Sequence, residues 1–292
     1  MLAAPIESTE SKTTVKPLRL ATCLFGGASA AAGILDLVWG EFEAAHQPIR
    51  GLGNHVPGEV FLAYLAAALL ITGGAGVLFR RTARAGAIAL GIVYLAFALF
   101  WLPRFYTAPH ALGFRFPVII GLIGGVFMQL ILVVAAAILY LSPSKRDSGS
   151  IQKVIPISRW TFGLAPISFG LVHLTAVAAT ARMIPPWMPL TPNFWVVLTG
   201  IAFAAAGLGI LARVLDLLAA RLLALMLLLF DVLVLVRLPY GSPHNHVAWG
   251  ANAYNLAAAG AVWIFAESIA RWRSDPHSRT HFETSPAARP LR

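Results

Sequence analysis

The sequence predicts an all-α, polytopic membrane protein in which eight transmembrane helices form two parallel four-helix repeats. The first observation is composition: 58% of the 292 residues are hydrophobic and only 12% are charged, whereas about a quarter of the residues of a soluble domain are charged. The second is that apolar runs of roughly 20 residues, the length that crosses a bilayer as a helix, recur along the chain. The third is that three short phrases occur in the same order in each half.

Eight apolar segments have, or approach, the length of a membrane-spanning helix. They are Leu20–Gly40, Val60–Phe79, Ala85–Leu102, Phe116–Leu141, Trp160–Ala181, Phe194–Ala212, Leu222–Val236 and Val247–Ala266. The seventh is short and includes Asp231, so it spans only if the helix tilts or Arg237 reaches to the interface. The first is longer than a signal-peptide core and no small-residue cleavage site follows it, so we interpret it as a retained helix.

Lysine and arginine residues predict the orientation, because cytoplasmic loops of membrane proteins are rich in both. With eight spans and the N-terminus inside, 17 of the 22 Lys and Arg fall in inside segments. These segments are 1–19, 80–84, 142–159, 213–221 and 267–292. We therefore expect a multi-pass protein of the cell inner (plasma) membrane with both termini cytoplasmic. The basic residues lie between apolar runs rather than along one face, which indicates a lipid bilayer as the partner and no nucleic acid.

A repeat is predicted by matching phrases on either side of the polar stretch 143–158. "FGGASAAAG" (25–33) matches "FGLAPISFG" (162–170), "GAGVLFR" (74–80) matches "GLGILAR" (207–213), and Tyr-x-x-Pro-His occurs at 106–110 and at 240–244. Because each repeat has an even number of spans, both have the same orientation and are related by an axis along the membrane normal. The expected organisation follows the chain in five parts. These are a cytoplasmic tail at 1–19, a first repeat at 20–142, a linker at 143–158, a second repeat at 159–267 and a basic cytoplasmic tail at 268–292.

The second half resembles the DoxX-like family of bacterial integral membrane proteins, and the first half resembles a more divergent copy. The phrases that carry the resemblance are "FGLVHL" (169–174), "MIPPWMP" (183–189), "FWVVLTG" (194–200), "AGLGIL" (206–211), "LAARLLALMLL" (218–228) and "AAAGAVWIFA" (257–266). The resemblance implies a four-helix membrane bundle, associated in some relatives with thiosulfate:quinone oxidoreduction or with membrane oxidoreductase complexes. This chain departs from the relatives at Phe203 and Arg237, where they often have histidine.

Polar residues near the extracytoplasmic ends of the spans are the candidates for a pocket. They are Asp36, Tyr106, His110, His173, Arg182, Tyr240 and His244. A pocket lined by them would suit a quinone head that enters from the lipid interface, with Arg182 and the histidines meeting its oxygens. The alternative is interfacial decoration, since Tyr is common at membrane surfaces and Pro-His can form an ordinary turn. We expect no metal site, because acidic or thiolate partners are absent at ligand spacing.

Three further polar residues lie deeper in the spans: Asp231, Asn252 and Asn255. An ionised carboxylate alone in a membrane is costly, so Asp231 needs a partner or a proton. The three residues either belong to a proton relay or form hydrogen bonds that fix the packing of two helices.

Three functions remain open on the sequence alone. The first, which rests mainly on the resemblance, is a component of a quinone-linked or redox-stress membrane system, with a quinone as its ligand and membrane oxidoreductases as its partners. The second is a structural or accessory subunit without chemistry of its own. The third is a carrier of a small hydrophobic or anionic molecule, since parallel repeats occur in carriers. Whether the protein is an enzyme is left open.

Overall fold

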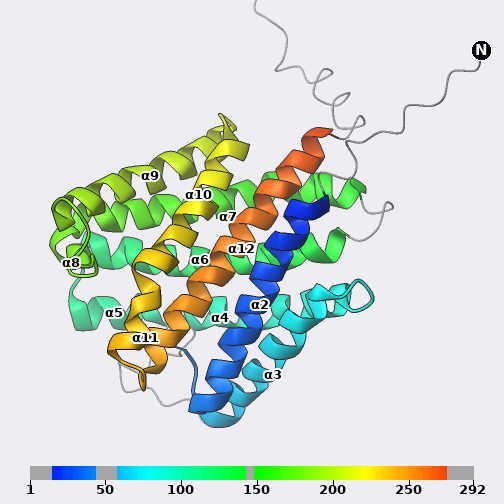
Figure 1. The fold of residues 1–292 in the computed structure, drawn as a ribbon, viewed down its shortest axis with the longest axis horizontal. Helices are drawn as coiled ribbons and strands as arrows, with labels where there is room; N and C mark the ends of the chain where they lie inside the picture. Colours follow the sequence, from blue (N-terminus) through cyan, green and yellow to red (C-terminus); the bar gives the residue numbers. More distant parts are fainter. Residues whose placement is uncertain (1–14, 44–57, 143–147, 275–292) are drawn as a thin grey trace, which may run out of the picture.

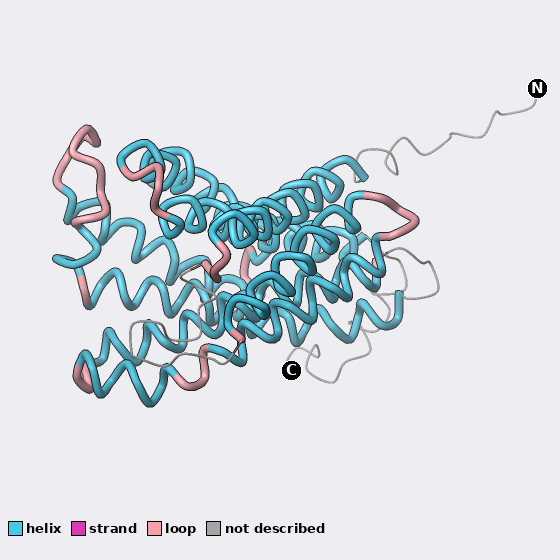
Figure 2. The backbone as a smooth tube through the Cα atoms, turned by 90° about the horizontal axis from the view of Figure 1, so that it is seen from below, coloured by secondary structure: helices cyan, strands magenta, loops and turns pink. Residues whose placement is uncertain are grey.

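The computed structural model describes residues 15–43, 58–142 and 148–274, and every regular element in these ranges is helical (Figure 2). The elements of the first half are α2 (Val15–Trp39), α3 (Glu59–Leu78), α4 (Ala83–Phe100), α5 (Arg104–Leu112) and α6 (Phe116–Leu141). Those of the second half are α7 (Ser148–Thr175), α8 (Val177–Ala181), α9 (Pro192–Ala212), α10 (Asp216–Leu233), η3 (Leu235–Arg237), α11 (Leu238–Gly241) and α12 (His246–Ser274).

Seven helices in the described ranges are long and apolar enough to cross a membrane, one fewer than the sequence predicts. The missing one is the expected span Trp160–Ala181. Its residues form α7, which is 28 residues long, and the separate short helix α8. Because α7 includes Arg159, His173 and two prolines, no stretch of it is apolar enough to count among these seven helices. The count of eight spans is therefore not confirmed.

Two boundaries differ from the expected ones. The linker expected at 143–158 is helical from Ser148 onward, because α7 continues through Pro156 without a break. The seventh span is longer than expected, since α10, η3 and α11 together form an apolar segment of 26 residues from Asp216 to Gly241. This length reaches across a bilayer without any help from the Arg237 side chain.

The long helices pack in a closed ring. Each packs against the next along the chain, α6 packs against α7, and α12 returns to pack against α2. In Figure 1, α12 lies between α10 and α2. The helix α12 also contacts α6 across the middle of the ring. We call the end where α2 begins and α12 ends the inner end, and the opposite end the outer end.

Glycines bring two helix pairs into close contact. A Cβ atom added to Gly74 would lie 2.4 Å from the carbonyl oxygen of Gly26, where α2 crosses α3. A Cβ atom added to Gly207 would lie 2.4 Å from the carbonyl oxygen of Gly163, where α7 crosses α9. Small residues allow membrane helices to approach this closely. These four glycines belong to the phrases that recur in the two halves.

Aromatic side chains fill the interior of the first half. Phe25, Phe42, Tyr94 and Phe97 are all buried. The Phe42 ring packs edge-on against Phe97, with 6.0 Å between the ring centroids. The Tyr94 hydroxyl shares a hydrogen bond of 2.7 Å with the Ser29 hydroxyl. The Ser29 hydroxyl also lies 2.8 Å from the Phe25 carbonyl oxygen, so a hydrogen-bonded hydroxyl pair is part of this packed aromatic core.

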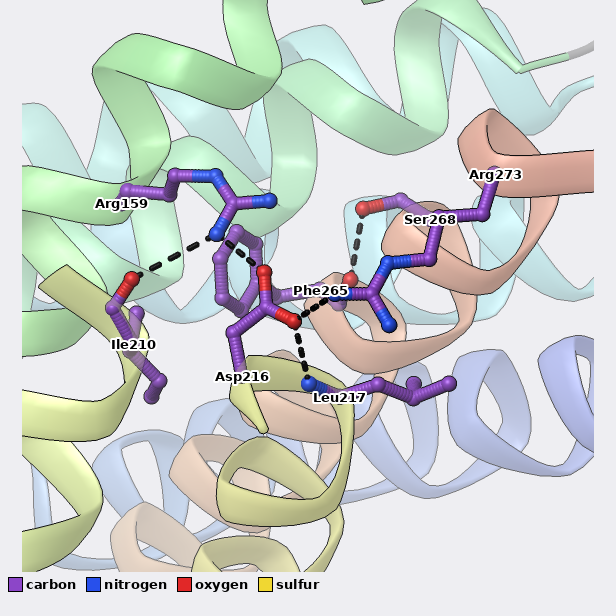
Figure 3. Close-up of polar contacts among 7 residues, drawn as sticks. All are labelled: Arg159, Ile210, Asp216, Leu217, Phe265, Ser268 and Arg273. Carbon is purple, nitrogen blue, oxygen red and sulfur yellow. Dashed lines mark hydrogen bonds and ion pairs between the residues drawn. The ribbon is translucent and has the colours of Figure 1, made fainter. Parts of the chain in front are cut away.

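A buried ionic junction joins the helices of the second half at the inner end (Figure 3). Asp216, at the start of α10, is fully buried and forms ion pairs with Arg159 of α7 and Arg273 of α12. Its carboxylate also accepts a hydrogen bond of 2.8 Å from the Leu217 N–H. Arg159 donates a second hydrogen bond, of 3.4 Å, to the Ile210 carbonyl in α9. One carboxylate thus links three helices, and its arginine partner reaches a fourth.

Candidate functional site

A cavity of about 620 Å³ lies between helix α6 of the first half and the helices of the second half. Its wall is formed by α6, α7, α9, α10 and α12, together with Trp101, Arg104 and Glu43 from the first half. The residues that line it on α10 and η3 run from Leu223 to Leu235, which corresponds to about 18 Å along a helix. The cavity is therefore elongated along the helices.

The two ends of the cavity differ in polarity. At the inner end the lining is apolar and includes Ile131, Phe162, Leu223 and Val262. At the outer end it includes the charged or polar side chains Glu43, Arg104, His173, Tyr254 and Asn255. An elongated cavity that is apolar at one end and polar at the other fits an amphipathic molecule whose head points outward.

Arg104 is held at the outer end by an aromatic ring. Its guanidinium lies 4.0 Å from the centre of the Trp101 ring, a cation–π distance. The ring also lies against Gly125 of α6, where an added Cβ atom would come within 2.1 Å of it. Burial lowers the pKa of Arg104, and the nearby Glu43 carboxylate opposes that shift. The guanidinium is therefore a fixed cation in the wall of the cavity.

Glu43 reaches the cavity because the chain turns inward after α2. Phe42 and Glu43 are both buried, at 1% and 3% exposure. The Glu43 side chain passes directly over Gly250 of α12, where an added Cβ atom would lie only 2.0 Å from the Glu43 Cγ. Any side chain at position 250 would therefore compete with Glu43 for the same space.

A row of aromatic rings forms the wall between α7, α9 and α10. The Phe203 ring stacks on Phe230 with 5.8 Å between centroids, and it lies 6.0 Å from Phe169 and 5.4 Å from the His173 ring. The Nδ1 atom of His173 lies 2.8 Å from the Phe169 carbonyl oxygen. This hydrogen bond orients the imidazole along its own helix, with one edge at the cavity. The wall offers flat surfaces on which a ring could stack.

Of the ten polar residues proposed from the sequence, the structure places His173 and Asn255 in the cavity lining. Five others are exposed and do not line it: Tyr106, His110, Arg182, Tyr240 and His244. Tyr106 and Tyr240 are 70% and 85% exposed, so the two Tyr-x-x-Pro-His phrases face lipid or water. The His110 ring packs on the ring of Tyr106, at 4.4 Å, rather than against a ligand cavity. The expected convergence of these residues on one pocket is not found, which matches the behaviour of interfacial tyrosines.

Asp36 is buried outside the cavity, where it joins α2 to α12. Its Oδ1 atom accepts a hydrogen bond of 2.9 Å from the Glu43 N–H and lies 3.4 Å from the His246 Nε2. The His246 Nδ1 lies 3.5 Å from Glu41, and its ring stacks on Trp39 at 5.0 Å. Asp36 thus holds the inward-turning segment that carries Glu43.

Asp231, Asn252 and Asn255 form contacts between α10 and α12. The Asn255 side chain donates to the Leu227 carbonyl at 2.8 Å and lies 3.5 Å from the Asp231 Oδ1. Asn252 donates to the Leu235 carbonyl at 3.0 Å. The Leu235 carbonyl lies in the 3₁₀ turn that follows α10, where it also accepts a hydrogen bond from the Leu238 N–H, so Asn252 ties α12 to this turn. These contacts correspond to the packing interpretation of the three residues.

Glu43, Arg104, Trp101 and Tyr254 were not among the pocket residues predicted from the sequence. The sequence contains a signal for Arg104 and another for Glu43. Arg104 is one of five basic residues on the side expected to be extracytoplasmic, and Glu43 lies among the acidic residues of the first outer loop. Neither signal shows that the two residues meet, because 61 positions separate them in the chain.

The fold and the composition define the class: a multi-pass α-helical membrane protein with a cavity among its helices. No protein-family model matches the chain. No curated protein and no solved structure matches it either.

Proposed function

We propose that this protein binds a small amphipathic molecule, with a quinone as the ligand, as a component of a quinone-linked or redox-stress membrane system. The observation that carries the proposal is the cavity, which is apolar toward the inner end and has Arg104, Tyr254 and Glu43 at the outer end. The resemblance of the second half to DoxX-like proteins supports the quinone link.

The chemistry of the lining supports this class of ligand. Arg104 and Tyr254 can donate hydrogen bonds to the ring oxygens of a quinone. The rings of Phe169, Phe203 and Phe230 offer apolar surface against which a quinone ring can pack, and the apolar inner part can hold a tail. In this proposal, Arg104 and Tyr254 contact the quinone oxygens, the role predicted from the sequence for Arg182 and the histidines.

The proposed topology is eight crossings in two parallel repeats, with both termini cytoplasmic in the cell inner membrane. The closed ring of helix contacts supports it, because α2–α12 and α6–α7 are corresponding contacts in a twofold arrangement. The glycine crossings Gly26–Gly74 and Gly163–Gly207 support it too, since they occur at corresponding places. The uneven distribution of Lys and Arg supports the orientation.

A carrier is the second candidate function, because α10 is interrupted beside the cavity. Its helix ends at Leu233 and a 3₁₀ turn follows from Leu235. Interrupted helices of this kind surround substrate sites in transporters. Flux of the ligand across proteoliposomes would separate a carrier from a protein that only binds.

A cavity-filling variant tests the proposed function. Gly121 lines the cavity, and a Cβ atom there would meet only Val172, at 3.8 Å, so Gly121→Phe places a ring in the cavity without a backbone clash. The matched control is Gly27→Phe, because Gly27 is exposed on α2 and has no atom within 4 Å of an added Cβ.

The measurement is the titration of protein in lipid nanodiscs with decylubiquinone, followed by quenching of tryptophan fluorescence. We expect the wild-type protein and Gly27→Phe to bind alike, and Gly121→Phe to bind at least about tenfold more weakly, a loss of roughly 1.4 kcal/mol. Quinone binding that is equal in all three proteins, or absent from the wild type, would overturn the proposal.

A further inference from the structure

The outer end of the cavity contains two opposite charges held by different parts of the chain. Glu43 and Arg104 both line it. The Glu43 carboxylate is close enough to favour the charged form of Arg104, and both act on the buried Tyr254 hydroxyl. The polar end therefore holds a carboxylate and a guanidinium whose charges cancel.

We infer that the Glu43–Arg104 pair makes the cavity select amphiphiles with an uncharged head group and reject those with a net charge. An uncharged head can accept a hydrogen bond from Arg104, as a quinone carbonyl does, and a head that also has a hydroxyl group can donate one to Glu43. This inference rests on the proposed function and adds the ligand's charge class to it.

The physical reason is the cost of an uncompensated charge away from water. An anionic head beside Arg104 would also lie near the Glu43 carboxylate, and a cationic head beside Glu43 would lie near the guanidinium. Either head leaves the site with one net charge in a cavity whose lining is mostly apolar, which is costly. An uncharged head leaves the pair neutral and still finds a donor and an acceptor.

Neither charge can easily move away from a ligand. Arg104 is fixed by the Trp101 ring, which is itself pressed against Gly125. Glu43 is fixed by contact with Gly250 and by the hydrogen bond from its N–H to Asp36. Since the two side chains are anchored to α6, α12 and α2 separately, a charged ligand could not be accommodated by a small rotation of one of them.

Three probes with the same tail and permanently different heads test the inference: dodecanol, dodecanesulfonate and dodecyltrimethylammonium. Their binding to the protein in nanodiscs is measured by displacement of decylubiquinone. For the wild-type protein we expect dodecanol to displace at least tenfold better than either ion. Glu43→Gln should raise the affinity for dodecanesulfonate, relative to that for dodecanol, by tenfold or more. Arg104→Gln should raise the relative affinity for dodecyltrimethylammonium by a similar factor.

The double variant Glu43→Gln with Arg104→Gln is the control for a folding defect. It removes both charges, so it should again prefer dodecanol, whereas a misfolded protein should not recover this preference. The charge selection would be overturned if the wild-type protein bound an ionic probe with the same affinity as dodecanol. It would also be overturned if the single variants left the ranking of the three probes unchanged. Neither result would contradict the binding of decylubiquinone. If none of the three probes displaces decylubiquinone, the cavity does not take amphiphiles and the inference is overturned. If decylubiquinone itself does not bind, the proposed function fails as well.

Discussion

At the level of single residues, the buried charges of this protein depend on neighbours that are small or flat. Glu43 lies in the cavity wall only because position 250 has no side chain, and Arg104 is supported by a tryptophan that lies on Gly125. A buried charge that loses such support must either move to water or remain without compensation. The glycines are therefore as important for the site as the charged residues.

Gly250→Ala is predicted to displace Glu43 and to destabilise the protein. The new methyl group would overlap the Glu43 Cγ at 2.0 Å, and overpacking of this kind costs about 1–3 kcal/mol. Thermal unfolding in detergent micelles would detect the loss as a lower Tm. The matched control is Gly27→Ala, at an open position of α2, where alanine should be neutral or stabilising by up to ~1 kcal/mol. Equal shifts for the two variants would contradict the contact between Gly250 and Glu43.

At the level of helices, the second half is closed at its inner end by the Asp216 junction (Figure 3). Asp216 is fully buried and Arg159 is 5% exposed, so this pair is shielded from water. Arg273 meets the same carboxylate, but its side chain is 46% exposed. The loss of Asp216 should therefore cost more free energy at Arg159 than at Arg273. The packing of α7 should depend on this carboxylate more than the packing of α12 does.

Asp216→Asn is predicted to be strongly destabilising, and Arg273→Ala only weakly so. The first variant leaves the Arg159 guanidinium buried without its anion, which typically costs about 3–5 kcal/mol. The second removes an exposed partner, and exposed ion pairs contribute roughly 0–1 kcal/mol. The Tm values of both variants in detergent give the comparison. Losses of similar size would show that Arg159 does not rely on Asp216.

The helices show how far sequence reasoning reaches. Apolar length predicted the positions of the long helices, because a membrane requires it. It did not predict that α7 begins at Ser148, since the polar composition of 148–158 resembles a linker and Pro156 resembles a helix break. The interruption after Leu233 was also missed, because the turn that follows is held in part by a hydrogen bond from Asn252 of another helix. Such support comes from tertiary contacts and has no local signature.

At the level of the whole molecule, the two halves use their interiors differently. In the first half, Phe25, Phe42, Tyr94 and Phe97 fill the space between the helices. In the second half, the space between α6, α7, α9, α10 and α12 remains open as the cavity. The residue that closes the polar end of this cavity, Glu43, nevertheless comes from the first half. The candidate site thus depends on both halves, although the phrases that recur in them lie mostly outside it.

The same distribution explains which site residues could be predicted. His173 was found because it is a polar residue within an apolar run, a pattern visible in the sequence. The Tyr-x-x-Pro-His phrases drew attention because they recur, but their tyrosines are exposed and do not line the cavity. Glu43 and Arg104 meet only through the way the chain turns inward after α2. No spacing rule connects them, so only the structure identifies the pair.

The topology leads to the last prediction, which concerns the direction of each crossing. After replacement of Cys23 by serine, single cysteines are introduced at four exposed positions: Thr82, Met183, Val214 and Ser242. Eight crossings with the N-terminus inside place 183 and 242 outside, and 82 and 214 inside. In intact cells, a membrane-impermeant maleimide should therefore label the first two and spare the others until the cells are opened.

The four positions distinguish the alternatives, because each gives a different pattern. If α7 does not cross, every later segment changes side: 82, 183 and 242 would be protected and 214 labelled. If all eight helices cross in the opposite direction, 82 and 214 would be labelled and the other two protected. The prolines and Arg159 reduce the hydropathy of α7, which is not among the seven helices apolar enough to cross. Yet α7 packs along both α6 and α9, and these neighbours can shield its polar groups from lipid. Labelling at 183 without labelling at 214 is therefore the outcome we expect.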